Sequence, residues 1–189
     1  MTPARSATRS TRAPSGPCSL YSCTAASIYD LLATHPLGAD TGERELIEAI
    51  YAEDVVFDRG AGLEGAAGRE AMAQLVGRDE HHAAIAGGLA HFGSLPLVDL
   101  SGDTAVAVSY LALITPDAHG ESRELANHGT SQGYRIHRVL ANRWTLERGT
   151  DGWRIASRTL LPADGSGPAL DLLRDAGSAH LRNGDRERR

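Results

Sequence analysis

Five polar side chains are candidates to point into an apolar cavity inside the protein. A buried polar group without a partner costs free energy, so each of the five needs a reason to be there. A carboxylate bound to one imidazole nitrogen fixes the tautomer and raises the basicity of the other nitrogen, which can then remove a proton from an organic substrate. A guanidinium or an amide nearby can stabilise the negative charge that develops. The five are His35 on an apolar helical stripe, Asp40 after it, His91 on a predicted strand, and Asn142 and Arg158 on the last two predicted strands.

Three other sequence features could carry chemistry, and we expect none of them to do so. The cluster DEHH (79–82) holds potential metal ligands, but no further ligand follows at useful spacing, so we expect a surface linker. The Gly-rich segment 60–68 follows no Rossmann-type strand and has no P-loop lysine, so we expect a loop. Cys18 and Cys23 lack the second ligand pair of a zinc site; they could form a disulfide, but we expect free thiols in a reducing cytoplasm. We therefore expect no metal and no cofactor.

The elements that must position the five side chains follow from hydrophobic periodicity. Ile28, Leu31, Leu32 and His35 recur at helical spacing, and Pro36 and Gly38 are expected to end or kink that helix. Asp40 or Thr41 could cap the next helix. The pattern predicts helices over 44–52, 69–76 and 169–176, strands over 54–58, 89–100, 104–114, 134–148 and 153–161, and a polar loop over 115–133.

Helices that precede a long antiparallel sheet predict an α+β fold and not a parallel one. At 189 residues we expect one domain over residues 21–165. Residues 1–20 begin with an acid-free segment rich in Arg, Ser, Thr and Pro, which predicts a disordered extension. We expect residues 166–189 to form a tail that contains a short helix, and we expect the last residues of this tail, NGDRERR, to be unstructured.

Composition excludes several classes of partner. The net charge of −5 argues against nucleic acid, because phosphate binding needs a concentrated basic surface. No apolar run approaches the roughly 20 residues that a membrane-spanning helix needs. We therefore expect a cytoplasmic protein that binds neither nucleic acid nor membranes.

The chain resembles the SnoaL-like branch of the nuclear-transport-factor-2-like superfamily, which includes scytalone dehydratase and hexachlorocyclohexane dehydrochlorinase. The resemblance covers roughly Ser27 to Leu161. It implies a cone-shaped barrel in which a strongly curved, mixed or antiparallel sheet wraps around the N-terminal helices. The matching pieces are SIYDLLATHPLGAD (27–40), RELIEAIYAEDVVFD (44–58), GREAMAQL (68–75), AHFGS (90–94) and DGWRIASRTL (151–160).

This resemblance implies roles for the polar side chains. Asp40 matches the catalytic Asp, and His91 matches the catalytic His, which would act as the base or as an acid–base shuttle. Arg158, five residues after Trp153, matches the Arg that steadies a leaving group. His35 and Asn142 match residues that line the pocket and bind substrate, and Trp144 shares the face of Asn142 as pocket wall or plain core.

Each residue also has a purely structural interpretation. Asp40 could be a helix cap, His91 a core histidine and Arg158 part of a structural salt bridge. We expect a cofactor-independent lyase or dehydratase, isomerase or cyclase that acts on a hydrophobic, cyclic or polyketide-like small molecule. The alternative is a non-catalytic binding cone or a structural subunit of a larger oxygenase complex. Cones of this kind commonly bury the convex face of the sheet, and outward positions such as Val106, Val108 and Tyr110 are too apolar for solvent, so we expect a homo-oligomer, a dimer or a trimer.

Overall fold

The computed structural model describes residues 20–187, with side chains described for residues 24–178. Most of the predicted extension, Cys18 and the side chain of Cys23 therefore lie outside the described residues. The helices are α1 (Leu20–Thr41), α2 (Arg44–Ile50), α3 (Arg69–Val76), α4 (Asp79–Ala86) and α5 (Gly167–Glu187). The strands are β1 (Tyr51–Asp58), β2 (Ala66–Ala67), β3 (Ala90–Gly93), β4 (Leu97–Ser101), β5 (Thr104–Pro116), β6 (Arg123–Leu125), β7 (Gly129–Ser131), β8 (Tyr134–Gly149) and β9 (Gly152–Pro162).

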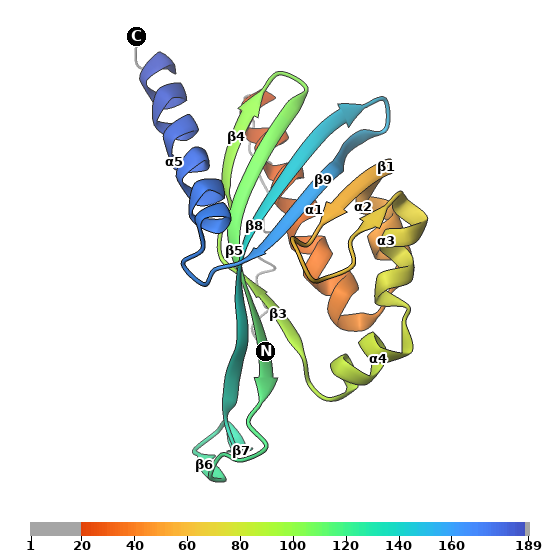
Figure 1. Cartoon of the computed structure of the whole chain (residues 1–189), viewed down its shortest axis with the longest axis vertical. Helices are drawn as coiled ribbons and strands as arrows, with labels where there is room; N and C mark the ends of the chain where they lie inside the picture. The colour runs from red at the N-terminus through yellow and green to blue at the C-terminus, as the bar shows by residue number, and fades with distance from the viewer. Residues whose placement is uncertain (1–19, 188–189) are drawn as a thin grey trace, which may run out of the picture.

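One sheet with the strand order β2-β1-β9-β8-β5-β3 organises the molecule, and β4 also pairs with β5 (Figure 1). The pair β1–β9 is parallel and the other pairs are antiparallel. Strands β5 and β8 form a long ribbon that carries the small β6–β7 hairpin near its far end (Figure 1). This arrangement confirms the predicted α+β class, with N-terminal helices followed by a mixed, largely antiparallel sheet.

Helix α1 packs on the inner face of the sheet through a stripe of buried side chains at spacings of four, three and four residues: Ile28, Leu32, His35 and Ala39. His35 is thus part of the buried stripe, as its spacing predicts. The helix does not end at Pro36 but continues to Thr41, since losing one backbone donor does not prevent a well-packed helix from continuing.

Gly42 ends helix α1 and thereby places Asp40 in the last helical turn. Its φ of +71° lies in the left-handed region that favours glycine. The Glu43 N–H donates to the Gly38 carbonyl at 3.1 Å, which is the hydrogen bond of a Schellman motif. Asp40 therefore belongs to α1 and does not cap α2, whose N-cap residue is Glu43.

Several helices and strands differ from the predicted ones. The single strand expected over 89–100 is two strands, β3 and β4, separated at Ser94–Pro96, and both pair with β5. Residues 79–82 begin helix α4 and are not a linker. The Gly-rich segment 60–68 includes the short strand β2, and the loop expected over 115–133 contains β6 and β7. Helix α5 extends through residues that composition assigned to an unstructured tail.

The outer face of the sheet is partly covered by α5. Val106, Val108 and Arg143 lie on this face, and Arg174 and Asp175 of α5 line the same surface cavity. Val108 is 7% exposed, whereas Tyr110 on the same strand is 47% exposed. Helix α5 thus shields part of the apolar surface from which self-association was inferred, and the homo-oligomer stays a prediction. Among residues 20–187, no helix combines the length and apolarity needed to span a membrane.

Candidate active site

The end of α1 and the start of β3 bring Asp40 and His91 together, although 51 residues separate them in sequence. Nδ1 of His91 lies 2.6 Å from Oδ1 of Asp40. The backbone nitrogen of His91 also donates to both carboxylate oxygens of Asp40, at 3.1 Å each. His91 therefore holds the carboxylate through its backbone, while the carboxylate orients the imidazole. Because the carboxylate accepts, Nδ1 carries the imidazole proton, and Nε2 keeps its lone pair.

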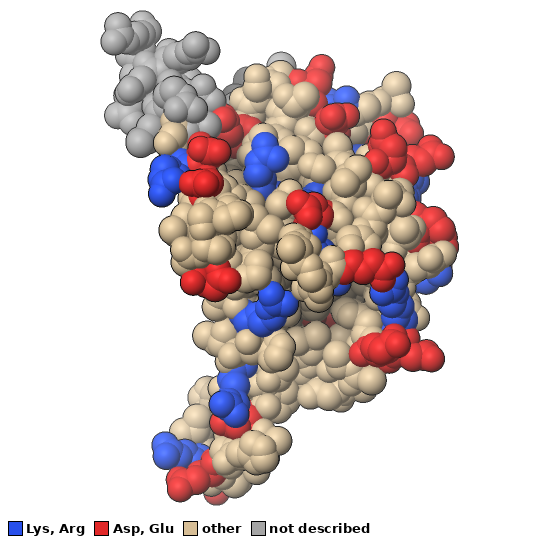
Figure 2. Space-filling view, viewed as in Figure 1, with Lys and Arg blue, Asp and Glu red and all other residues tan. Residues whose placement is uncertain are grey.

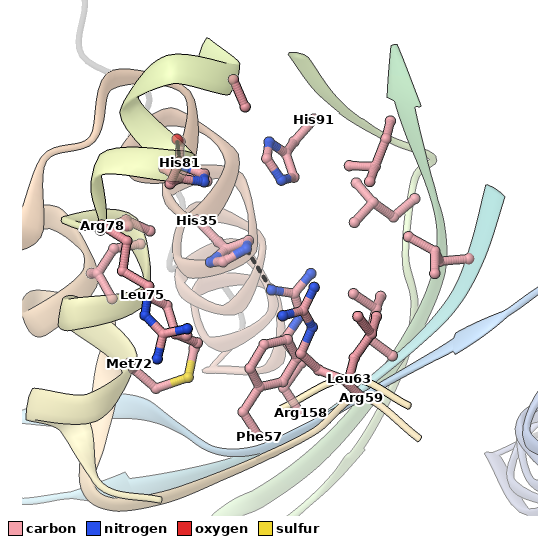
Figure 3. A pocket seen from close by; sticks show the side chains of 18 of the residues that line it. His35, Phe57, Arg59, Leu63, Met72, Leu75, Arg78, His81, His91 and Arg158 are labelled. Carbon is pink, nitrogen blue, oxygen red and sulfur yellow. Dashed lines mark hydrogen bonds between the residues drawn. The ribbon is translucent and has the colours of Figure 1, made fainter. Parts of the chain in front are cut away.

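Nε2 of His91 faces a cavity of about 750 Å³, within the usual range for small-molecule sites (Figure 3). His91 is partly buried, and its side chain is 14% exposed. Burial lowers the pKa of His91 below its ordinary value of 6.5, and the hydrogen bond to Asp40 opposes that effect only in part. His91 is consequently neutral at neutral pH, the form that a general base needs.

A second polar cluster is centred on Arg158, which is 4% exposed. Its Nε donates to Oδ1 of Asn142 at 3.1 Å, and its Nη1 donates to Nε2 of His35 at 2.6 Å. The guanidinium lies over the rings of Trp144 and Phe57, with its carbon 4.3 and 5.0 Å from their centroids. Both of these hydrogen-bond partners are uncharged, so the positive charge of Arg158 is not neutralised by them.

The hydrogen bonds of His35 determine its tautomer. Arginine can only donate, so Nε2 of His35 accepts, and its Nδ1–H donates to the Tyr51 hydroxyl at 3.1 Å. Burial, together with the charge of Arg158, keeps the pKa of His35 well below 6.5. Burial also raises the pKa of Tyr51 to about 12. His35 is therefore a neutral spacer and is not poised to exchange protons.

A β-bulge aims Arg158 into the protein. Trp153 and Ile155 are buried on the inner face of β9, and strict alternation from them would turn residue 158 outward. The β8–β9 register shifts between Thr145 and Leu146, so that two residues of β9 advance where β8 advances one. Arg158 and Leu160 thereby join the inner face.

Five of the six predicted site residues divide between two neighbouring cavities, and Asp40 lines neither of them. His35, His91 and Arg158 line the 750 Å³ cavity, whereas Asn142 and Trp144 line a second cavity of about 410 Å³. His35, Leu111 and Arg158 line both cavities and form the partition between them. Asn142 and Trp144 contact Arg158 from behind this partition, so the structure places them where they can position the guanidinium.

His81 also lines the main cavity, and sequence analysis missed it because residues 79–82 were expected to form a surface linker. Its Nε2–H donates to the Ala39 carbonyl at 2.6 Å, one of the last carbonyls of α1, which lack a partner within the helix. Its ring centroid lies 6.1 Å from that of His91. The signal that could have indicated a helix here is the pair of acids Asp79 and Glu80, which suit the positive end of a helix dipole. Among the described side chains, no three His, Cys, Asp or Glu residues gather as a metal site.

Sequence comparison identifies the family of this chain. The SnoaL-like domain matches residues 22–159, and the chain therefore belongs to the SnoaL-like family. No curated protein shows significant sequence similarity to it.

Solved structures share the fold. An NTF2-like protein with a cystatin-like fold from Novosphingobium aromaticivorans is 31% identical, with a TM-score of 0.67, over 84% of this chain and 99% of that one. A Catenulispora acidiphila protein in complex with S-DNPA is 22% identical, with a TM-score of 0.57, over 74% of this chain and 93% of that one. A Streptomyces avermitilis protein described as a "putative dehydratase from the NTF2-like family" is 12% identical, with a TM-score of 0.54, over 76% and 98%.

Proposed function

We propose that this protein is an acid–base enzyme, a lyase or dehydratase, an isomerase or a cyclase, acting on a hydrophobic cyclic or polyketide-like molecule without a cofactor. The observation that carries the proposal is the 2.6 Å contact between Asp40 and His91, with Nε2 of His91 directed into the main cavity. The SnoaL-like family, which includes enzymes, supports it, as does a relative crystallised with a small molecule. The cavity would be the interior of the cone.

In this mechanism His91 removes a proton from the substrate through Nε2. Asp40 holds the imidazole in the productive tautomer and stabilises the imidazolium that forms. Arg158 lines the same cavity and carries a full positive charge among uncharged partners. It would stabilise a developing enolate oxygen or a departing group, and that stabilisation is large in a site with little water.

Two observations favour an enzyme over a non-catalytic cone or an oxygenase subunit. The dyad is paired, whereas a purely structural cone would not need an ionisable pair beside its cavity. The cavity is also open, since side chains leave about 750 Å³ beside His91. A structural subunit would more naturally fill this space with apolar side chains.

The experiment is hydrogen–deuterium exchange at the α-carbon of 2-tetralone, a bicyclic ketone that reports proton abstraction next to a carbonyl, followed by NMR. We expect the wild type to accelerate exchange and His91→Ala to lose about 10²–10⁴-fold of that rate, the usual contribution of a positioned base. The matched control is His137→Ala, because His137 is exposed on β8 and does not line the cavity. Equal exchange rates for His91→Ala and wild type, with unchanged thermal melts, would refute the proposal.

A further inference from the structure

The lining of the main cavity carries an excess of positive charge. Its charged residues are four arginines and two glutamates: Arg59, Arg78, Arg138, Arg158, Glu64 and Glu80. Glu64 is already paired with Arg78 at 3.1 Å. The whole chain has a net charge of −5, and acidic and basic side chains intermingle on the face seen in Figure 2. The positive cavity is thus a local feature of the site.

Two of these guanidinium groups lie beside the same aromatic ring. The guanidinium carbons of Arg59 and Arg158 lie 5.8 and 5.0 Å from the centroid of Phe57 (Figure 3). Arg59 contacts the Glu64 backbone carbonyl at 3.5 Å, and its Nε is buried without a hydrogen-bond partner among the described residues. Burial lowers the pKa of Arg59, and the charges of Arg138 and Arg78 lower it further, whereas the charge of Glu64 opposes them only in part. Like charges held together in a half-buried site are costly unless an anion joins them.

Arg138 extends this positive region across the sheet from the dyad. The strand pairings align His91 with Leu113 and Leu113 with Arg138, and all three side chains line the cavity. Neighbouring strands lie about 4.7–4.9 Å apart, so the backbone of Arg138 lies two strand spacings, about 10 Å, from that of His91. The exposed Asp164 is an acid close enough to feel the charge of Arg138, but it does not line the cavity.

We propose that Arg59 and Arg138 bind an anionic group of the substrate, a carboxylate or a phosphate ester, while the apolar body of the substrate lies against His91. This inference rests on the proposed function and narrows its substrate class to organic acids. Guanidinium groups form strong, charge-assisted hydrogen bonds to both kinds of oxyanion.

Calorimetric binding of matched acids and amides tests the inference: benzoate, 2-naphthoate and 9-anthroate, each against its carboxamide. We expect at least one acid to bind tenfold or more tightly than its amide, and Arg59→Gln and Arg138→Gln each to reduce that preference about tenfold. The control is Arg135→Gln, because Arg135 is exposed on the same strand and does not line the cavity. 2-Naphthyl phosphate distinguishes the source of the anion, since tighter binding than 2-naphthoate indicates a phosphate ester. Less than threefold preference throughout the panel, including no binding at all, would overturn the inference, as would an undiminished preference in both arginine variants.

Calorimetric binding of the same acids and amides to the Asp40→Asn variant separates this inference from the proposed function. Loss of the dyad should leave the acid preference intact, because Asp40 does not line the cavity. Acid preference without dyad-dependent exchange of 2-tetralone would sustain the binding site and refute the catalytic role. Dyad-dependent exchange without acid preference would do the opposite.

Discussion

The dyad and the Arg158 cluster meet at one cavity but differ in how they hold charge. Asp40 pairs with His91 at the edge of the cavity, and the Asp40 side chain stays 31% exposed. Arg158 is 4% exposed, and its cavity-side partner His35 is neutral. Access to water lowers the cost of an ionised carboxylate, whereas the buried guanidinium keeps its charge because arginine hardly deprotonates in proteins.

The two histidines show the consequence for proton transfer. Burial lowers the pKa of both, but the hydrogen bond that His91 donates to Asp40 counteracts this at His91, whereas the charge of Arg158 adds to it at His35. Of the two, His91 is the histidine whose carboxylate partner favours the protonated form. In the proposed mechanism, histidine would thus act as a base at one end of the site and as a neutral hydrogen-bond partner at the other.

The largest expected effect comes from inverting the polarity of the dyad with Asp40→Asn. An amide NH₂ can donate to Nδ1 of His91, which would move the imidazole proton to Nε2 and remove the base. We expect the exchange rate of 2-tetralone to fall about 10²–10⁴-fold while the thermal melt stays near that of wild type. Asp54→Asn, an exposed acid outside the cavity lining, is the matched control. An unchanged rate in Asp40→Asn would show that the carboxylate does not orient the base.

A smaller effect concerns the buried His35, which should make the free energy of unfolding depend on pH. The pKa of His35 is lowered in the folded state, so below its ordinary value of 6.5 the unfolded chain binds the additional proton. The free energy of unfolding should thus be highest above pH 6.5 and fall below it by up to about 1.4 kcal/mol per pH unit for this residue.

His35→Gln tests this stability prediction, because its amide can accept from Arg158 and donate to Tyr51 without titrating. Urea unfolding between pH 5 and 8 should give a shallower decline for this variant than for wild type. His137→Gln changes an exposed histidine and should leave the wild-type slope. If the free energy of unfolding of His35→Gln fell as steeply with pH as that of wild type, a group other than His35 would cause the pH dependence.

The smallest expected effect couples the two clusters. The charge of Arg158 contributes to lowering the pKa of His91, so Arg158→Met should raise that pKa. The pH midpoint of the exchange rate, or of the His91 signal in an NMR titration, should consequently move upward. Arg143→Met, on the outer face of the same sheet, should leave it in place. A downward shift in Arg158→Met would contradict the electrostatic coupling.

Periodicity and the family resemblance were sufficient for the class of fold and for most of the site. The helical stripe ending at His35 and the alternating strands predicted the α+β class. The resemblance paired Asp40 with His91, a contact across 51 residues that no local pattern contains. Local signals failed where tertiary packing overrides them: α1 passes through Pro36, and α4 begins at the cluster expected to form a linker.

The residues missed by sequence analysis are those whose importance depends on neighbours distant in sequence. Arg59 and Arg138 look like ordinary surface arginines until β1 and β8 bring them to one cavity. Tyr51 looks like a core aromatic until its hydroxyl meets His35. A propensity or a period describes one segment at a time, and none of these contacts lies within one segment.

By itself, then, the sequence determined most of the long helices and strands and the place of His35 on a buried helical stripe, because both follow from the local periodicity of apolar and polar side chains. Only the tertiary structure decided that Arg158 faces the cavity, since a bulge in β9 reverses the side-chain alternation that starts at Trp153. It also decided that the guanidinium groups of Arg59 and Arg158 share the Phe57 ring, because that proximity arises from strand pairing and not from any spacing along the chain.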